Sequence, residues 1–95
     1  MLLWLLQDKY MNRSGDILLT VLSPSKTVLE IRVVNVTLPA SKGRFMVLRN
    51  HAPVITSLDE GDVVYETSTG QTDRLHVLSG FAEVCENIVT VCAEV

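Results

Sequence analysis

The chain has 95 residues, of which 47% are hydrophobic, and a formal net charge of −3 at neutral pH. A chain of this length forms one domain, and its negative charge argues against a nucleic-acid binder, which carries a broad basic face. The hydrophobic fraction is high for so small a domain, so we expect part of the apolar surface to meet a partner rather than water.

Residues 1–16 are expected to form an N-terminal extension, ordered or disordered, before a domain that spans residues 17–95. The extension starts with the apolar run Met1–Leu6, MLLWLL. A secretory signal needs an apolar region of about 7–15 residues, and a membrane helix needs about 20, so neither is predicted. Trp4 and the neighbouring leucines could dock on the domain or on a partner. Alternatively, the segment is a mobile tail or an upstream extension, because Met11 could serve as the true start.

Short runs rich in β-branched residues recur along the rest of the chain, separated by Gly, Pro, Asn and Asp. No window keeps a helical period over several turns. This pattern predicts an all-β fold, either a sandwich or a barrel. The first run, Ile17–Leu22, is apolar at every position except Thr20, so we expect it to be buried on both faces.

The run Val28–Leu38 is the longest predicted strand, and its hydrophobic pattern changes phase midway. Apolar residues share one parity up to Val33 and the opposite parity from Val34 onward. A slip of one residue turns every later side chain to the other face of a sheet, unless the strand bends or passes to a second sheet. We therefore predict a bend at Val33–Val34, at a corner between two sheets.

The segment Leu38–Asp62 carries a cluster of positive charge. Lys42, Arg44 and Arg49 fall within eight residues that contain no acid. Such a loop is a candidate for contact with a partner, although a solvated loop is the commoner interpretation of three charges. We expect the segment to consist of a basic loop, a short strand, a polar turn, a second strand and an acidic turn, at residues 40–44, 45–48, 49–53, 54–58 and 59–62.

A hairpin is predicted to join Val63–Thr67 to Arg74–Leu78 around a turn of small polar residues. His76 falls on its second strand, between Leu75 and Val77. We expect this histidine to be packed or exposed rather than functional.

A second hairpin is predicted to join Phe81–Cys85 to Ile88–Ala93 through the two-residue turn Glu86–Asn87. On its outer face, Cys85 and Cys92 would lie about four strand residues apart, roughly 13 Å. A disulfide needs Cα atoms within about 7 Å, so we predict two free thiols, as in a reducing compartment. The residues expected to face the core share the other parity: Ala82, Val84, Val89, Val91 and Ala93.

The sequence predicts neither catalysis nor a cofactor. His51 lies in the turn Asn50–Pro53, and a small hydrolase that uses His51 is an alternative that requires a nucleophile or acid nearby, such as Ser57 or Asp59. We favour a structural role or a partner contact for His51. The two His and two Cys lack zinc-binding spacing, and the isolated glycines form no phosphate loop.

Several short motifs occur in a fixed order along the chain. They are Leu19–Pro24, Thr37–Pro39, Gly43, Val47–Leu48, Asn50–Pro53, Gly61, Ser79–Val84 and Asn87–Val91. The set, which covers residues 17–95, resembles the β-sandwich of the epsilon subunit of F-type ATP synthases. This resemblance implies a flattened two-sheet sandwich of about ten short strands.

The resemblance implies a non-catalytic subunit in the central stalk of a proton-translocating ATP synthase. One face of the sandwich would pack against the gamma subunit, and the edge after Leu38–Pro39 would rest on the polar loops of the membrane-embedded c-ring. By position, His51 lies near the gamma side, and the c-ring contact falls on Ser41, Lys42, Gly43 and Arg44. The chain would thus help to couple ring rotation to ATP synthesis, with no cofactor, no metal and no nucleic-acid partner.

The chain departs from the family pattern in two respects. Many members carry acidic residues where Lys42 and Arg44 stand here. Most members continue into a C-terminal helical hairpin, which restrains ATP hydrolysis and in some bacteria binds ATP. Because the sequence stops at Val95, we do not carry either role over to it.

The expected location is the cytoplasmic face of a bacterial plasma membrane, reached through protein contacts. A mitochondrial protein is disfavoured because no Arg- and Ser-rich transit peptide precedes the domain. The alternative to a stalk subunit is a free-standing β-sandwich that binds a peptide or a carbohydrate. That alternative requires an aromatic-lined groove, whereas the aromatic residues are scattered: Trp4, Tyr10, Phe45, Tyr65 and Phe81.

Overall fold

The computed structural model describes residues 17–95, which form nine β-strands and no helix. The prediction of an all-β fold of short strands is confirmed. The N-terminal extension predicted for residues 1–16 lies outside the described residues. The strands are β1 (Ile17–Leu22), β2 (Thr27–Val33), β3 (Asn35–Leu38), β4 (Phe45–Val47), β5 (Val54–Leu58), β6 (Gly61–Glu66), β7 (Thr72–Val77), β8 (Ser79–Cys85) and β9 (Ile88–Glu94).

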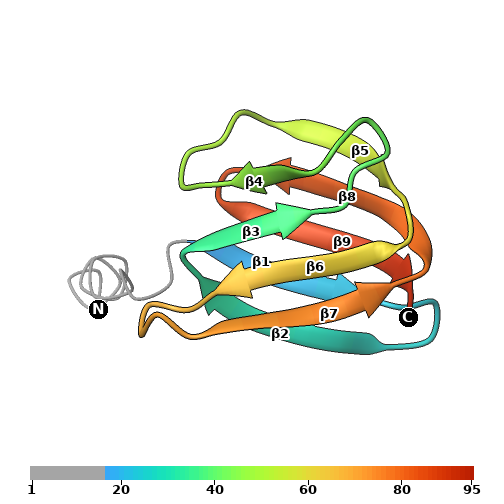
Figure 1. The fold of residues 1–95 in the computed structure, drawn as a ribbon, viewed down its shortest axis with the longest axis horizontal. Coiled ribbons are helices and arrows are strands. Elements are labelled where there is room, and N and C mark those ends of the chain that lie inside the picture. Colours follow the sequence, from blue (N-terminus) through green and yellow to red (C-terminus); the bar gives the residue numbers. More distant parts are fainter. Residues whose placement is uncertain (1–16) are drawn as a thin grey trace, which may run out of the picture.

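The strands form two sheets stacked face to face, as predicted for a sandwich (Figure 1). The larger sheet has five strands in the order β2-β1-β9-β8-β5, and the smaller sheet has four in the order β4-β3-β6-β7. Neighbouring strands are antiparallel except β1 and β9, which run parallel. The edge strands are therefore β2 and β5 in the larger sheet, and β4 and β7 in the smaller sheet.

The chain passes from one sheet to the other between β2 and β3, which confirms the predicted bend. β2 ends at Val33 in the larger sheet, and β3 begins at Asn35 in the smaller sheet. Between them, the backbone N–H of Val34 donates to the carbonyl of Glu66 at 2.8 Å. Val33 and Val36 are both fully buried, because the change of sheet compensates for the change of hydrophobic phase.

The β8–β9 hairpin has the predicted register. Phe81 pairs with Cys92, and the turn residues Glu86 and Asn87 have positive φ angles of 49° and 64°. Positive φ at both central residues is typical of a type I′ turn, whose twist suits a two-residue hairpin. The residues predicted to face the core are buried, and Cys85 and Cys92 are free thiols.

Two predictions about single strands are wrong in detail. The outer face of β1 is only half-buried, because it belongs to the outside of the larger sheet; its residues are Leu18, Thr20 and Leu22. Asp62, predicted in an acidic turn, lies in β6 instead. This strand begins two residues earlier than the predicted start at Val63, because Gly61 already pairs with Val77 of β7.

The core between the sheets consists of apolar side chains from both. Within residues 17–95, no polar or charged residue is buried. Burial of apolar surface therefore holds the sandwich together, while the polar groups lie on its outer faces, edges and loops. The largest fully buried side chains are Ile17, Leu19, Val21, Val33, Val36, Leu38, Val47, Val63, Val77, Val84, Val89 and Val91.

Candidate functional site

The basic loop between β3 and β4 begins by running along the edge of β5. Ala40 forms a bridge with Leu58. The backbone N–H of Ser41 donates to the carbonyl of Ser57 at 3.0 Å, and the N–H of Asp59 donates to the carbonyl of Pro39 at 2.9 Å. This pairing fixes the start of the loop against the larger sheet, although the strand that it leaves and the strand that it enters both belong to the smaller sheet.

The loop then turns away from β5 at Gly43. The N–H of Gly43 donates to the carbonyl of Ala40 at 2.9 Å, and its φ angle of +127° is one that residues with a Cβ rarely adopt. The turn leaves an open groove of about 620 Å³ between the loop and β5, which we call the edge groove. Its lining residues are Ala40, Lys42, Gly43, Arg44, Phe45, Val54, Ile55, Thr56 and Ser57.

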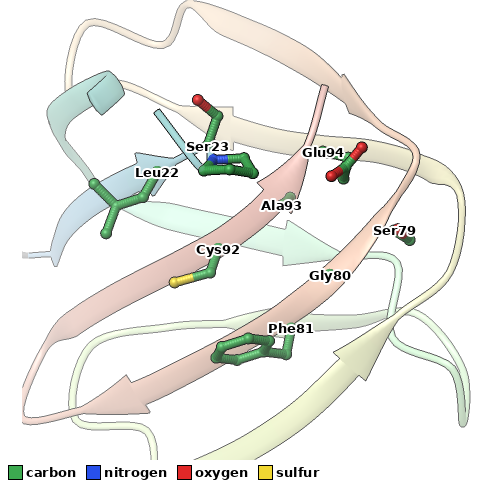
Figure 2. A pocket seen from close by; sticks show the side chains of 9 residues that line it. Leu22, Ser23, Ser79, Gly80, Phe81, Cys92, Ala93 and Glu94 are labelled. Carbon is green, nitrogen blue, oxygen red and sulfur yellow. The ribbon is translucent and has the colours of Figure 1, made fainter. Parts of the chain in front are cut away.

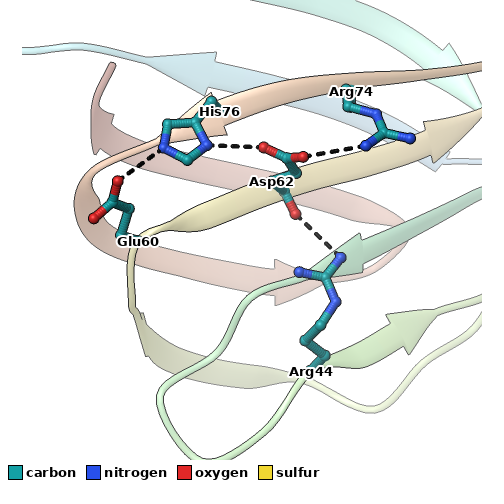
Figure 3. A network of polar contacts seen from close by, with 5 residues as sticks. All are labelled: Arg44, Glu60, Asp62, Arg74 and His76. Carbon is teal, nitrogen blue, oxygen red and sulfur yellow. Dashed lines mark hydrogen bonds and ion pairs between the residues drawn. The ribbon is translucent and has the colours of Figure 1, made fainter.

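The four residues predicted for the c-ring side are all exposed on this loop: Ser41, Lys42, Gly43 and Arg44. The hydroxyl of Ser41 donates to the carboxylate of Asp59 and accepts from the hydroxyl of Ser57, both at 2.9 Å. Arg44 donates from Nη2 to the backbone carbonyl of Asp62 at 3.2 Å (Figure 3). The loop is thus anchored at both ends, while its two cations face solvent.

His51 lies on the loop after β4, at the opposite end of that strand from the basic loop. Its Nδ1 is 2.7 Å from the carbonyl oxygen of Ala52, so Nδ1 carries the proton and donates. The centroid of the imidazole ring also lies 5.8 Å from the centroid of the Phe45 ring. The predicted structural role of His51 in its turn therefore has a physical basis. Because Nδ1 binds a backbone carbonyl and not a carboxylate, the hydrolase alternative loses its support.

The loop that carries His51 is joined to the β8–β9 turn. The backbone N–H of Asn50 donates to Oδ1 of Asn87 at 2.6 Å, and Nδ2 of Asn87 donates to Oδ1 of Asn50 at 3.2 Å. Asn50 itself has a positive φ angle of 66°, a conformation that Asn tolerates better than most residues. These two side chains bring His51 to one end of the larger sheet.

The outer face of the larger sheet is unusually apolar. Ile55, Phe81 and Ile88 are exposed at 73%, 52% and 45% of their surface. Leu22, Cys92 and Phe81 form a row across β1, β9 and β8, and this row borders a shallow groove of about 370 Å³ (Figure 2). Exposed apolar side chains gathered on one face favour an interaction site. We call the outer face of the larger sheet the apolar face, and it is a candidate for the partner surface that the composition predicts.

A polar network on the smaller sheet was missed by sequence reasoning. Nδ1 of His76 lies 2.9 Å from the carboxylate of Asp62, and Nε2 lies 3.1 Å from that of Glu60 (Figure 3). These two hydrogen bonds raise the pKa of His76. The hydrogen bond from His76, helped by the charges of His76 and Arg74, lowers the pKa of Asp62. The feature that could have revealed this network is the register of the hairpin, which places Asp62 directly opposite His76.

The described part of the chain gives little support for a metal site or for a membrane-spanning helix. No group of three or more His, Cys, Asp or Glu residues in residues 17–95 is placed to hold a metal ion. None of the described residues forms a helix long and apolar enough to cross a membrane. The surfaces that stand out, the basic loop and the apolar face, are suited to binding rather than to bond-making.

Comparison with known proteins agrees with this description. A family described as "ATP synthase, Delta/Epsilon chain, beta-sandwich domain" matches residues 16–95. The "ATP synthase epsilon chain" of Desulfatibacillum aliphaticivorans is 41% identical over 81 residues, which are 85% of this chain and 57% of the relative. That of Nostoc is 42% identical over 72 residues, which are 75% of this chain and 53% of the relative. The chain thus spans little more than half the length of these relatives.

Solved structures share the fold. A chain of the mitochondrial ATP synthase of Euglena gracilis, solved as OSCP/F1/c-ring, superposes with a TM-score of 0.77 at 24% identity, over 84% of this chain and 51% of that one. A chain of the central stalk/c-ring of the Tetrahymena thermophila enzyme gives a TM-score of 0.70 at 11% identity, over 86% and 66% of the two chains. Together with the family match over residues 16–95, these results show that the chain belongs to the family of ATP synthase delta/epsilon chain β-sandwich domains.

Proposed function

We propose that the chain is a non-catalytic subunit of the central stalk of a bacterial F-type ATP synthase. In this role it links the gamma subunit to the c-ring and helps to couple proton-driven ring rotation to ATP synthesis. The observation that carries the proposal is the family match, which covers the whole of the described sandwich. The subunit works at the cytoplasmic face of the plasma membrane, held there by its protein partners.

The c-ring side is the basic loop, through Ser41, Lys42, Gly43 and Arg44. These residues are exposed, and the pairing of Ala40 and Ser41 with β5 supports the loop from behind. A loop held in one conformation loses less entropy on binding than a mobile one. Since the loop presents Lys42 and Arg44, the c-ring offers acidic or carbonyl acceptors opposite them.

The gamma side is the apolar face, with His51 at its rim. Exposed Phe81 and Ile88 supply apolar area for a stable stalk contact. The hydrogen bonds between Asn50 and Asn87 hold the His51 loop next to the end of that face. One surface faces the rotor shaft and the other faces the ring, which is the arrangement that a linking subunit needs.

Binding to the gamma subunit of the same organism is the first test. We expect the 95-residue chain to form a stoichiometric complex with gamma, and Phe81→Asp to weaken it by roughly tenfold or more. Met46→Asp is a matched control, because Met46 is exposed to nearly the same extent, 51% against 52%, but lies on the smaller sheet. Absence of binding at micromolar concentrations would reject the stalk role.

The c-ring contact needs a separate test in membranes. The double variant Lys42→Glu/Arg44→Glu reverses both cations, and we expect it to weaken the contact with the ring and to reduce ATP-driven proton pumping. Lys26→Glu, in the turn between β1 and β2, is the control for a change of charge alone. Unchanged coupling in membranes that carry the double variant would contradict the assignment of the loop to the c-ring.

A further inference from the structure

The edge groove exists because the chain covers only one end of the free edge of β5. Among the described residues, β5 has β8 as its one strand neighbour. On the opposite edge, residues 39–41 pair with Ser57, Leu58 and Asp59. The turn at Gly43 then leads the chain across to β4 in the smaller sheet. The part of the edge around Ile55 is left beside the open groove.

The backbone of Ile55 faces this groove. The carbonyl of Ser57 points to the same edge, because it accepts the N–H of Ser41. In a β-strand the backbone groups of residues two apart point in the same direction, so the N–H and carbonyl of Ile55 also point away from β8. An edge with such groups is a template on which another strand can pair.

The walls of the groove select the partner by shape and charge. Phe45 and Val54 pack partly against the core and present the rest of their surface to the groove. Lys42 and Arg44 line the same groove, and none of its lining residues is acidic, although the chain as a whole is negative. Arg44 uses Nη2 for the carbonyl of Asp62, and its guanidinium has further N–H donors.

We propose that the edge groove binds an extended segment of a protein partner in which apolar and acidic residues alternate. The segment adds a short strand to β5 and continues the pairing that residues 39–41 begin. Its backbone exchanges hydrogen bonds with Ile55, its apolar side chains cover Phe45 and Val54, and its carboxylates meet Lys42 and Arg44. This inference deepens the contact proposed for the basic loop and rests on the proposed function only for the identity of the partner.

A strand fits these features better than a membrane surface or a small anion does. A lipid headgroup or a phosphate ion would satisfy the two cations and leave the backbone of Ile55 unused. A peptide strand uses the cations, the apolar walls and the backbone together, and alternation of its side chains follows from the two-residue period of a strand.

The test is an NMR titration of the uniformly labelled 95-residue chain with blocked synthetic peptides. The probe peptide alternates Val and Glu, and the control peptide alternates Val and Lys. We expect the Val-Glu peptide to shift the amide signals of Ile55 and Ser57 and to slow hydrogen exchange at the Ile55 amide. The Val-Lys peptide should bind roughly tenfold more weakly or worse.

Two sets of variants separate the backbone contact from the charge contact. Ile55→Pro removes the N–H that faces the groove but no hydrogen bond to β8, and Pro is tolerated on edge strands at such positions. We expect it to weaken peptide binding by about tenfold, whereas Ile55→Ala keeps the N–H and most of the binding. Lys42→Glu/Arg44→Glu should have an effect of similar size, and Lys26→Glu should have none. The charge variants keep the test decisive if Ile55→Pro fails to fold.

Several results would overturn the inference. They are equal binding of the two peptides, shifts centred on the apolar face around Phe81, and full binding by Ile55→Pro. Binding of phosphatidylglycerol vesicles or inorganic phosphate without binding of the Val-Glu peptide would also overturn it. The added strand and the proposed function can each be rejected without the other. A coupling defect in the double variant with no peptide binding rejects the added strand alone, and peptide binding with normal coupling rejects the c-ring assignment alone.

Discussion

The β8–β9 hairpin and the exposed edges of β4 and β5 contain similar residues but differ in how completely their strands are paired. β8 and β9 have seven residues each and a strand on both sides, whereas β4 and β5 have three and five residues and a strand on one side only. The backbone of the hairpin is paired on both sides, because β1 flanks β9 and β5 flanks β8. The β4–β5 edge leaves backbone groups, cations and apolar side chains exposed and available to another molecule. At β5, incomplete pairing therefore leaves the edge on which we propose that a partner strand adds.

The largest expected effect comes from filling Gly80 in β8. A Cβ at Gly80 would lie 2.1 Å from the carbonyl oxygen of Cys92 and 2.7 Å from the Cα of Ala93, at a φ angle of +155°. Backbone cannot yield as a flexible side chain can, so we expect Gly80→Ala to destabilise the domain by roughly 3 kcal/mol or more. Urea denaturation followed by circular dichroism measures the loss.

Gly43, in the basic loop, is the matched position at the open edge. It also has a positive φ angle, but a Cβ there would meet nothing within 4 Å. Gly43→Ala should therefore cost only the conformational strain, about 1–2 kcal/mol. Equal losses for the two variants would show that the hairpin is no more tightly constrained than the edge and would remove the contrast drawn above.

The second prediction concerns the contact that joins the two regions. Asn87→Gly keeps the positive φ angle of the β8–β9 turn but removes both side-chain bonds to Asn50. We expect a loss of about 1 kcal/mol, which corresponds to a fall in Tm of about 4–8 °C for a domain of this size. Asn87→Ala should lose more, because Ala also suffers strain at this φ angle.

The site of the change can be located by hydrogen exchange. In Asn87→Gly, the amide of Asn50 should exchange faster, since it loses its acceptor, Oδ1 of Asn87. The amides of the β8–β9 ladder should change only by the global loss of stability. A selective loss of protection in β8 and β9 would mean that Asn87 supports the hairpin and not the loop beside it.

The smallest expected effect is a pH dependence of stability, and it arises outside both the β8–β9 hairpin and the β4–β5 edge. The pKa of His76 is raised above its ordinary value of 6.5 by Asp62 and Glu60. A group whose pKa is raised in the folded state stabilises the fold fully at pH values below its ordinary pKa. This stabilisation is lost as the pH rises through the folded-state pKa. His76→Gln should therefore lower Tm more at about pH 5.5 than at about pH 8.5. An equal drop in Tm at both values would deny the network a role in stability.

What the sequence could predict is largely what neighbouring residues decide. The change of parity after Val33 predicted the crossing between sheets, and Glu86–Asn87 predicted the last hairpin, because each signal lies within one strand or one turn. The contact of Asp62 with His76 was missed because Asp62 was predicted in the turn before the hairpin strand. The pairing of Ser41 with Ser57 depends on how two segments meet in space. Periodicity carries no information about such meetings. The basic loop was therefore found as a cluster of charge, but the groove behind it was not.

The parallel pairing of β1 with β9 has a consequence for the synthesis of the domain. β1 lies between β2 and β9, so its place in the larger sheet is complete only when Leu18–Leu22 has met Ile88–Cys92. The ribosome makes roughly 5–20 residues per second, so β1 waits several seconds for its neighbour. Contacts so distant in sequence also slow folding itself. During that interval, β1 lacks its neighbour on one edge, so we expect the nascent chain to be more prone to aggregate then than after β9 has paired.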